Sequence, residues 1–348
     1  MNEKPLPDWS RLGFALTETD WIYVAHATGR QSPSWDEGQF RPFAPIEVSP
    51  AAAFLSYGQG VFEGLKARRV EDGRIVLFRP ESNAARFRRS AVRLGLPAFP
   101  EERFVATVAE LTRRNSRWVP PAGSGSFYLR PVLLASEPRL GLGLCERFTT
   151  VFYGSPVGPY FSGGESRGLK LRVLEQGRVA PGGTGAAKAM GNYAGTLPLA
   201  AEWKQRGFDD VLFLDAKGAG LVSETVGSNV FAVLDSGTLV TPPLDDQILP
   251  GVTRDSVLRI AREICGLNVE ERPLPIDELL DRAAEMFCTG TAYRLQPVGE
   301  LSHRDRVKRF AATATRDALL RVLEGIQQGQ RDDPFDWVRT IGTEERRR

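Results

Sequence analysis

Histidine and cysteine are scarce in this chain of 348 residues, which holds two histidines and three cysteines. Because His26 and His303 are the only histidines, most histidine-based triads and multi-histidine metal sites are excluded, and we predict no metal. The cysteines, Cys145, Cys265 and Cys288, are odd in number and far apart, and the N-terminus has no apolar signal segment. We therefore expect no disulfide framework and a reducing, cytoplasmic location.

Charge imbalance and long apolar runs are also missing. Forty-five Lys and Arg stand against 43 Asp and Glu, for a net charge of +2, and the basic residues are dispersed apart from short runs. This pattern lacks the concentrated basic surface of a nucleic-acid or membrane-surface protein. No apolar run approaches the ~20 residues that a membrane span requires. We therefore predict a soluble protein with neither nucleic-acid nor membrane partners.

The length predicts two domains, and a hydrophobic content of 42% is enough for two cores. A stretch rich in proline, glycine and serine at residues 156–167 interrupts the alternation of strand-like and helix-like patterns. We predict a mixed α+β fold with a small N-terminal α/β domain over residues 1–159. We predict that this domain is followed by an interdomain loop over residues 160–167 and a larger C-terminal domain over residues 168–348.

Hydrophobic periodicity places the main elements. We expect strands at residues 20–25, 60–68, 74–78, 126–134, 210–215, 228–234 and 238–240. We expect helices at residues 81–94 and 101–115, and a third that starts after Gly251 and stops at Gly266. Residues 217–220 are predicted to form a turn, and residues 235–237 a hairpin loop.

One lysine is set among small residues. Residues 182–193 read Gly-Gly-Thr-Gly-Ala-Ala-Lys-Ala-Met-Gly-Asn-Tyr, and such neighbours let a planar cofactor reach Lys188. Lysine readily loses its proton when desolvated, so Lys188 is a candidate Schiff-base former or general base. A phosphate-binding loop would require Ser or Thr where Ala189 follows the lysine. A solvated, glycine-rich surface loop remains the simpler alternative for this segment alone.

A lysine-bound cofactor such as pyridoxal phosphate needs further groups. The helix after Gly251 offers first-turn amides and a positive dipole end to a phosphate, or is an ordinary loop-to-helix junction. Arg86 of the helix at residues 81–94 offers a guanidinium, although a solvated helix face is the alternative for Arg86, Arg88, Arg89 and Arg93. Glu224 lies in an apolar stretch, where a buried carboxylate needs a cationic partner; an exposed hairpin is the alternative. Tyr193 offers a hydroxyl to the cofactor or packs in the core.

Six strings, in order along the chain, resemble those of the branched-chain amino acid aminotransferases, which are class IV pyridoxal-phosphate enzymes. They are residues 56–67 (Ser-Tyr-Gly-Gln-Gly-Val-Phe-Glu-Gly-Leu-Lys-Ala), 128–131 (Tyr-Leu-Arg-Pro), 182–193, 241–243 (Thr-Pro-Pro), 248–254 (Ile-Leu-Pro-Gly-Val-Thr-Arg) and 289–298 (Thr-Gly-Thr-Ala-Tyr-Arg-Leu-Gln-Pro-Val). The resemblance spans nearly the whole chain. It implies the two-domain class IV fold, whose larger C-terminal domain is β-barrel-like with helices and binds the cofactor.

The resemblance also implies a role for each matching position. Lys188 becomes the catalytic lysine that binds pyridoxal 5'-phosphate. The implied cofactor contacts are Arg86 and the amides of Val252 and Thr253 for the phosphate, Tyr193 for the ring oxygen, Glu224 for the ring nitrogen, and Thr291. The implied substrate contacts are Phe62, Tyr128 and Arg130, the turn of Thr291 and Ala292 that receives the carboxylate, and Tyr57, which the family supplies from the neighbouring subunit.

The implied activity is the transfer of the amino group of L-leucine, L-isoleucine or L-valine to 2-oxoglutarate, by a homodimer with shared active sites. Its small-molecule partners are then amino acids and 2-oxo acids. Residues 189–190 and 225–228 depart from the pattern of many relatives, which leaves substrate preference open. Alternatives on the same scaffold are amination of an unusual oxo acid, D-amino acid transamination and aminodeoxychorismate lysis. A non-catalytic relative is an alternative of another class.

Overall fold

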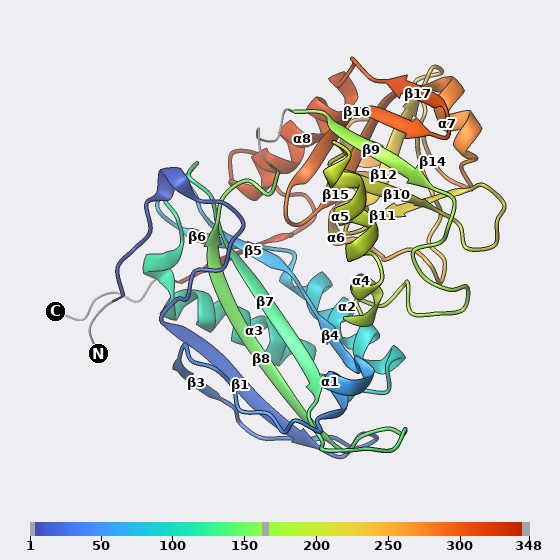
Figure 1. The fold of residues 1–348 in the computed structure, drawn as a ribbon. Coiled ribbons are helices and arrows are strands. Elements are labelled where there is room, and N and C mark those ends of the chain that lie inside the picture. Colours follow the sequence, from blue (N-terminus) through green and yellow to red (C-terminus); the bar gives the residue numbers. More distant parts are fainter. Residues whose placement is uncertain (1–3, 162–166, 343–348) are drawn as a thin grey trace. The chain divides into compact units, whose positions relative to one another are not determined.

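The computed structural model describes residues 4–161 and 167–342 (Figure 1). The chain divides into two compact units, each built on a nine-stranded sheet. The first unit consists of the chain up to Tyr160, the segment Ala187–Gly191 and the chain from Gly325 onward. The second unit consists of Phe161–Ala186 and Asn192–Glu324. Two sheets with helices confirm the predicted mixed α/β class.

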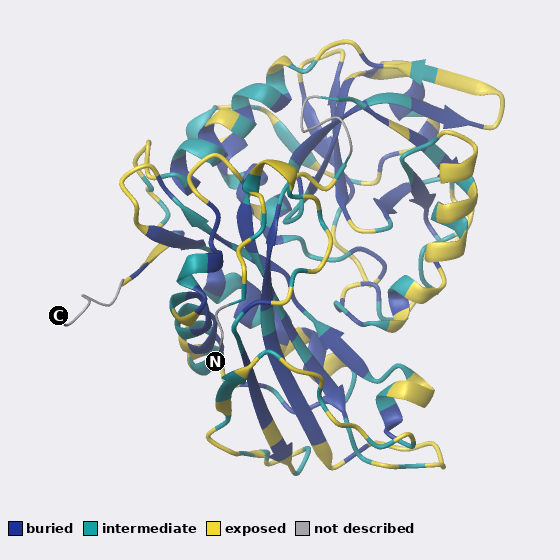
Figure 2. Cartoon of the chain, turned by 60° about the vertical axis from the view of Figure 1, so that its left-hand side comes forward, coloured by how far each residue is buried: buried dark blue, intermediate teal, exposed yellow. Residues whose placement is uncertain are grey.

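The sheet of the first unit is antiparallel throughout, in the order β18-β6-β5-β7-β8-β1-β2, with β3 paired to β1 and β4 to β7. Its strands are β1 (Trp21–Thr28), β2 (Ser34–Trp35), β3 (Gln39–Pro42), β4 (Gly60–Phe62), β5 (Leu65–Arg69), β6 (Ile75–Phe78), β7 (Ser126–Ala135), β8 (Arg147–Val157) and β18 (Val338–Ile341). Its long strands are mostly buried, whereas many connecting loops are exposed (Figure 2).

Two helices, α2 (Pro80–Arg93) and α3 (Glu101–Arg114), pack on this sheet. α2 begins at Pro80. Proline has no N–H, but an N–H in the first turn of a helix has no hydrogen-bond partner within the helix, so the proline costs no hydrogen bond there. Phe87 of α2 and Phe104 of α3 lie with ring centroids 5.4 Å apart, and Phe104 lies 5.3 Å from Phe152 of the sheet. This aromatic contact makes α2 a fixed platform for the polar side chains on its buried face.

The sheet of the second unit has the order β11-β10-β9-β16-β15-β12-β13-β14, with β17 paired to β16. It is mixed, because β9 runs parallel to both β10 and β16, and β13 parallel to β14. Its strands are β9 (Leu169–Leu174), β10 (Asp210–Leu214), β11 (Val222–Thr225), β12 (Asn229–Leu234), β13 (Leu239–Thr241), β14 (Val269–Glu271), β15 (Ala283–Gly290), β16 (Arg294–His303) and β17 (Arg306–Arg309).

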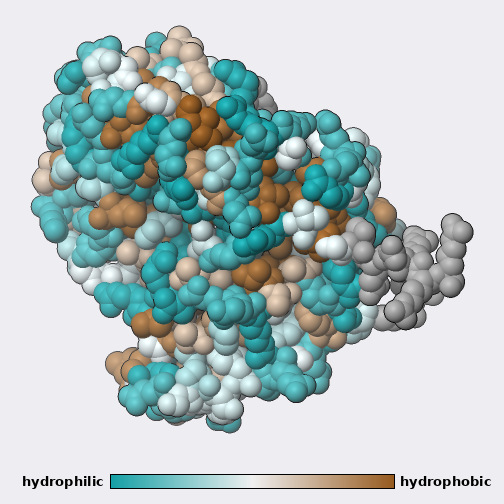
Figure 3. Space-filling view, turned by 180° about the vertical axis from the view of Figure 1, so that it is seen from behind, coloured by the Kyte–Doolittle hydropathy of each residue, from teal (hydrophilic) through white to brown (hydrophobic). Residues whose placement is uncertain are grey.

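The other helices are short, apart from the last. They are η1 (Trp9–Arg11), α1 (Ala53–Tyr57), η2 (Ser116–Trp118), α4 (Gly191–Ala194), α5 (Leu197–Gln205), α6 (Val252–Arg259), its π-helical continuation η3 (Ile260–Ile264), α7 (Ile276–Arg282) and α8 (Ala314–Gln327). Among the described residues, no helix is both long and apolar enough to cross a membrane. The face seen in Figure 3 is largely hydrophilic, with separate hydrophobic patches.

Most elements expected from periodicity are confirmed within one to three residues, among them both helices of the first unit and the loop at residues 235–237 between β12 and β13. The single strand expected at residues 60–68 is wrong, because β4 and β5 are separate strands. Glu63 donates its N–H to the carbonyl of Pro131 on β7, and proline has no N–H to return, so the ladder is interrupted there. Of the predicted interdomain loop, residues 162–166 lie outside the described residues.

Candidate active site

The backbone around Lys188 is held on the first unit. The Phe62 N–H donates to the Lys188 carbonyl at 3.2 Å, and the Met190 N–H donates to the Gly60 carbonyl at 3.0 Å, so the lysine segment lies along β4. On the other side, the Lys188 N–H donates to the Ser90 hydroxyl of α2 at 2.9 Å. Three backbone bonds to two elements therefore fix the position from which the lysine side chain extends.

The lysine segment also shows why its glycines are needed. A side chain on Gly185 would place its Cβ 2.4 Å from the Gln247 carbonyl oxygen, so a neighbouring backbone requires this glycine. The Gly182 N–H donates to the Asp246 carboxylate, in a conformation with a φ of 70° that favours glycine. Close packing at Gly182 and Gly185 therefore accounts for part of the small-residue pattern, which cofactor access alone does not explain.

Lys188 forms one cluster with three other predicted residues, Phe62, Tyr128 and Arg130. Lys188 Nζ lies 4.6 Å from the Phe62 ring centroid, and the guanidinium carbon of Arg130 lies 4.8 Å from the same ring. Arg130 also lies 5.3 Å from the Tyr128 ring, and its Nη2 donates to the Tyr128 hydroxyl at 3.4 Å. Two cations over aromatic faces form a surface that is both apolar and positively charged.

Two further aromatic residues extend this surface. Phe14 makes an edge contact with Tyr128 at 5.1 Å between centroids, and Tyr160 makes one with Phe14 at 4.9 Å. Neither residue was singled out from the sequence. Phe14 belongs to none of the six strings, so no motif marks it, and only the folding of the N-terminal segment brings it against β7.

Arg86 is the buried arginine of α2, whereas Arg88, Arg89 and Arg93 are exposed. Its Nε and Nη2 donate to the two carboxylate oxygens of Glu63 at 2.6 and 2.8 Å. Burial therefore distinguishes Arg86 from the other arginines of the helix, which the sequence alone did not do.

Glu63 itself is fully buried. Its Oε2 also accepts from Asn83 Nδ2 at 2.8 Å and from the Gly64 N–H at 3.0 Å. Burial is the strongest single influence and would raise its pKa, but the charge and bonds of Arg86, the Lys188 charge and the Asn83 bond together hold the pKa of Glu63 below its ordinary value. Sequence reasoning missed this residue; the signal was a carboxylate inside an apolar strand pattern.

In the second unit, Glu224 is buried on β11, as its apolar surroundings predicted. Its Oε1 pairs with Nη2 of Arg178 at 2.6 Å, and both side chains are less than 5% exposed. Arg178 Nη2 also donates to the carbonyls of Gly185 at 3.2 Å and Gln247 at 3.3 Å. The expected cationic partner of Glu224 is thus present, and it is a residue that the sequence did not single out.

Glu224 is also linked to the segment that precedes α6. It accepts from the Leu249 N–H at 3.1 Å and from Asn229 Nδ2 at 3.0 Å, and the same Nδ2 donates to the Leu249 carbonyl at 2.9 Å. A Cβ on Gly251 would lie 2.1 Å from Asn229 Oδ1, so this glycine lets the segment pass close to Asn229. The segment leads directly into the first turn of α6, where the predicted phosphate amides of Val252 and Thr253 lie.

The remaining predicted residues occupy three places. Thr291 and Ala292 form the turn between β15 and β16, beyond the pairing of Thr289 with Asn229. Tyr193 lies half-buried in α4. Tyr57 ends α1, is 42% exposed, and its hydroxyl donates to the Leu140 carbonyl.

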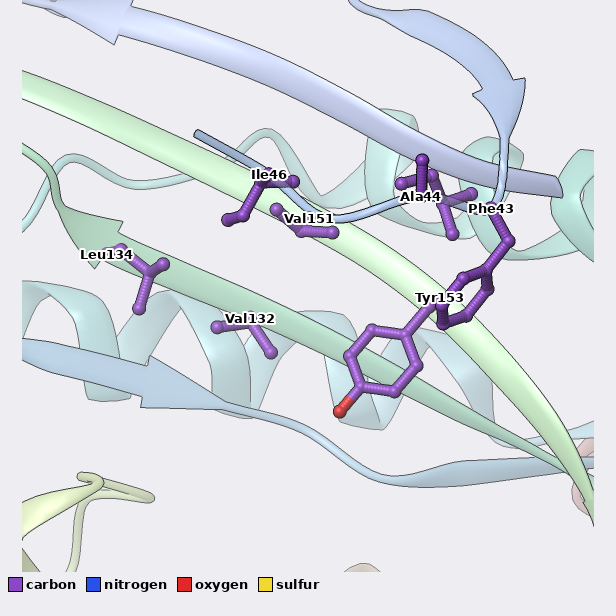
Figure 4. Close-up of a pocket in the computed structure, with 8 residues that line it drawn as sticks. Phe43, Ala44, Ile46, Val132, Leu134, Val151 and Tyr153 are labelled. Atoms are coloured by element: carbon purple, nitrogen blue, oxygen red, sulfur yellow. The ribbon is translucent and has the colours of Figure 1, made fainter. Parts of the chain in front are cut away.

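An apolar pocket lies elsewhere on the first unit (Figure 4). Its lining comes from β1, β7, β8 and the segment after β3, and consists of Ile22, Phe43, Ala44, Ile46, Val132, Leu134, Val151 and Tyr153. None of these residues is among the predicted site residues, and none carries a formal charge. The pocket therefore does not suit a phosphate or carboxylate ligand.

The chain is similar to known proteins along most of its length. The sequence model of the amino-transferase class IV family matches residues 60–301. The branched-chain amino acid aminotransferase 2, chloroplastic, of Humulus lupulus is 42% identical over 336 residues, covering 95% of this chain and 81% of that protein. A methionine aminotransferase of Arabidopsis thaliana is 39% identical over 333 residues, covering 95% and 92%.

Among solved structures, the branched-chain aminotransferase of the thermophilic archaeon Thermoproteus uzoniensis with norvaline superposes with a TM-score of 0.77. It is 28% identical, and the match covers 93% of this chain and 100% of that one. Another branched-chain amino acid aminotransferase, solved with pyridoxamine 5'-phosphate, superposes with a TM-score of 0.78 at 27% identity, covering 94% and 100%.

Proposed function

The chain belongs to the class IV aminotransferase family, and from that premise we propose that it transfers the amino group of L-leucine, L-isoleucine or L-valine reversibly to 2-oxoglutarate. The observation that carries the proposal is the cluster of Lys188 and Arg130 against the rings of Phe62 and Tyr128, because it combines an amine, a second cation and apolar walls. These are the groups that a reaction between an aliphatic amino acid and a dicarboxylic oxo acid requires.

The residues fit pyridoxal 5'-phosphate as the cofactor. Arg86 and the first-turn amides of α6 suit its phosphate, Glu224 suits a protonated ring nitrogen, and Tyr193 suits the ring oxygen. When bound, the cofactor supplies an electron sink that stabilises negative charge at the substrate α-carbon. A structure relative that contains pyridoxamine 5'-phosphate supports the same assignment.

Lys188 carries the proton transfers. Its amine would hold the cofactor at rest and, once free, would take the proton from the substrate α-carbon and return it on the cofactor side. The backbone bonds to β4 and Ser90 hold it in place for both transfers. Two such half-reactions would complete the cycle: the first would take the amino group from a branched-chain amino acid, and the second would give it to 2-oxoglutarate.

Substrate binding follows from the same cluster. Phe62 and Tyr128 bind the branched side chain, and Arg130 between them attracts the γ-carboxylate of glutamate. The turn of Thr291 and Ala292 is assigned to the α-carboxylate, and Thr291 is also assigned to the cofactor. Each buried methylene contributes only about 0.8 kcal/mol, so discrimination among the three branched amino acids is expected to be shallow.

The test is Lys188→Ala, with Lys170→Ala as a matched lysine on the surface of β9. We expect Lys188→Ala to lose at least about 10³-fold in turnover of leucine with 2-oxoglutarate while it keeps its circular dichroism and its affinity for the cofactor phosphate. Lys170→Ala is expected to keep full activity. Multiple turnovers by pure Lys188→Ala would contradict the assignment, and a screen of valine, isoleucine, methionine and D-alanine on the wild type would locate the substrate preference.

The protein is also proposed to act as a homodimer with shared active sites. An exposed apolar patch supports this. It consists of Leu55 and Tyr57 of α1 and Leu140 of the loop after β7, where the Tyr57 hydroxyl donates to the Leu140 carbonyl and Leu140 is 91% exposed. Patches of this kind mark protein interfaces. Tyr57 belongs to the patch, which suits a residue supplied to the site of a second copy.

Subunit mixing tests this sharing. Mixing Tyr57→Ala chains with Lys188→Ala chains forms hybrid dimers in which one site holds both wild-type residues. We expect activity above that of either parent, provided that Tyr57→Ala is itself impaired. Absence of recovery, with subunit exchange shown by a mass-labelled chain, would contradict the sharing.

The proposed location is the cytoplasm. No disulfide joins Cys145, Cys265 or Cys288, all of which are described, and the pKa of Cys288 is raised to about 12 by burial, against a hydrogen bond from Ser228. A thiol so shielded is compatible with any reducing compartment, and several plant relatives carry the words chloroplastic or mitochondrial in their names. Fractionation of the native cells, followed by immunodetection, distinguishes these compartments.

A further inference from the structure

α2 presents three buried polar residues along one face. Asn83, Arg86 and Ser90 are spaced by three and four residues, which places them on one stripe of the helix. Ser90 accepts the Lys188 N–H, while Asn83 and Arg86 both donate to Glu63. One helix face therefore contacts both the lysine segment and a carboxylate that the reaction, as described, does not use.

The contacts of Glu63 are those of a holder for Arg86. A guanidinium is planar and has five N–H groups, of which Nε–H and one Nη2–H donate to the two oxygens of Glu63. This two-bond fork allows one orientation of the plane, and so fixes the direction of the other N–H groups. Asn83 and the Gly64 N–H in turn hold the carboxylate.

We propose that Glu63 is a positioning residue for the cofactor phosphate, because it locks Arg86 in the orientation that receives that phosphate. This inference rests on the proposed function, in which Arg86 is the phosphate ligand. The negative charge of Glu63 acts against this positioning effect, since a carboxylate beside Arg86 reduces the attraction of Arg86 for the phosphate anion. The two contributions predict opposite signs for the loss of Glu63, so experiment can separate them.

The test compares binding of pyridoxal 5'-phosphate with binding of pyridoxal, which lacks the phosphate, in apo-protein by absorbance and fluorescence titration. We expect Glu63→Gln to weaken binding of the phosphate form at least about tenfold, because the amide cannot accept both guanidinium bonds, and to leave pyridoxal within about twofold. Glu63→Asp keeps the charge but shortens the reach by one methylene. It is expected to weaken the phosphate form as well, so a folding defect in one variant does not remove the test.

Two further variants complete the design. Arg86→Met should show the same phosphate-specific loss, and the double variant Glu63→Gln with Arg86→Met should lose no more than Arg86→Met alone. The matched control is Glu285→Gln, another buried carboxylate, which accepts from the Thr315 and Arg316 N–H groups at the start of α8. It is expected to lower the melting temperature without changing the ratio of the two affinities.

The outcomes separate this inference from the proposed function. Glu63→Gln or Glu63→Asp with wild-type preference for the phosphate form, tighter binding of that form, or losses additive with Arg86→Met would each overturn the role of Glu63 and leave the proposed function intact. Unchanged binding of the phosphate form by Arg86→Met would overturn the Arg86 assignment, and the role of Glu63 with it.

Discussion

The two units each contain a buried arginine–glutamate pair, and the roles within the pairs are reversed. In the first unit, Arg86 is assigned to the cofactor and Glu63 is its partner; in the second, Glu224 is assigned to the cofactor and Arg178 is its partner. The assigned residue carries the charge opposite to its proposed ligand, a phosphate in one case and a protonated ring nitrogen in the other.

The pairs also differ in how they are supported. Glu63 is held by an α2 side chain and the next backbone N–H, whereas Arg178 donates to the carbonyls of Gly185 and Gln247. Arg178 thereby ties the strand of Glu224 to the loop that leads to Lys188. An isolated buried charge is costly, so each assigned residue needs a partner, and that partner also sets its orientation.

Within the two pairs, the largest expected effect comes from removing the charge assigned to the ring nitrogen. Glu224→Gln is expected to lower kcat by about 10²–10³-fold, because loss of one electrostatic group that acts in the transition state has effects of that size. Steady-state kinetics with leucine measure it, with Glu202→Gln on the exposed face of α5 as the control. If kcat stays within about threefold of wild type, Glu224 is a structural residue and the comparison between the two pairs fails.

A smaller effect is expected from the partner. Arg178→Met leaves Glu224 buried without its cation, and we expect a loss of about 3 kcal/mol in the free energy of unfolding. In the double variant with Glu224→Gln, part of this loss should return, because the uncompensated charge is gone. Urea denaturation followed by circular dichroism provides the values. Strictly additive losses would show that the two residues do not act as a pair.

The smallest effect concerns Asp210, a carboxylate whose pKa is set by burial rather than by an arginine. Burial raises its pKa to about 6 from 3.8, against hydrogen bonds from the Val211 N–H and Thr225, and the Asp209 charge adds to the rise. The folded state therefore binds the proton more tightly, and stability falls as pH rises from about 4 through about 6. The contrast with Glu63, whose pKa is lowered, shows the combined effect of Arg86, Lys188 and Asn83 on a buried carboxylate.

We expect wild type to lose about 2 kcal/mol of unfolding free energy relative to Asp210→Asn between about pH 4 and about pH 7, after allowance for the half-buried side chain. Urea denaturation at the two pH values measures this difference. A flat difference between the two proteins would mean that Asp210 titrates at its ordinary pKa.

The residues alone predicted many features of the candidate site. Lys188 among small residues, the arginine-bearing helix and the glycine before α6 each have a local physical reason, and six ordered strings place them in one family. Periodicity predicted α2, because a helix needs only its own apolar stripe and end signals. Neighbouring residues therefore determined most helices and strands and the choice of Lys188 as the candidate catalytic lysine, whereas the cofactor class followed from the resemblance of the six strings to a family.

The partners of the charged groups were decided by the tertiary structure. Glu63 meets Arg86 because it follows the end of β4, where its N–H donates to the carbonyl of Pro131 on β7 and its carboxylate faces α2. Arg178 meets Glu224 because the segment before Lys188 packs against Gln247. Strand register and loop packing bring together residues that are far apart in the chain, and no local pattern encodes such a meeting. Burial on α2 likewise singled out Arg86 among four arginines, since exposure depends on which face of the helix the sheet covers.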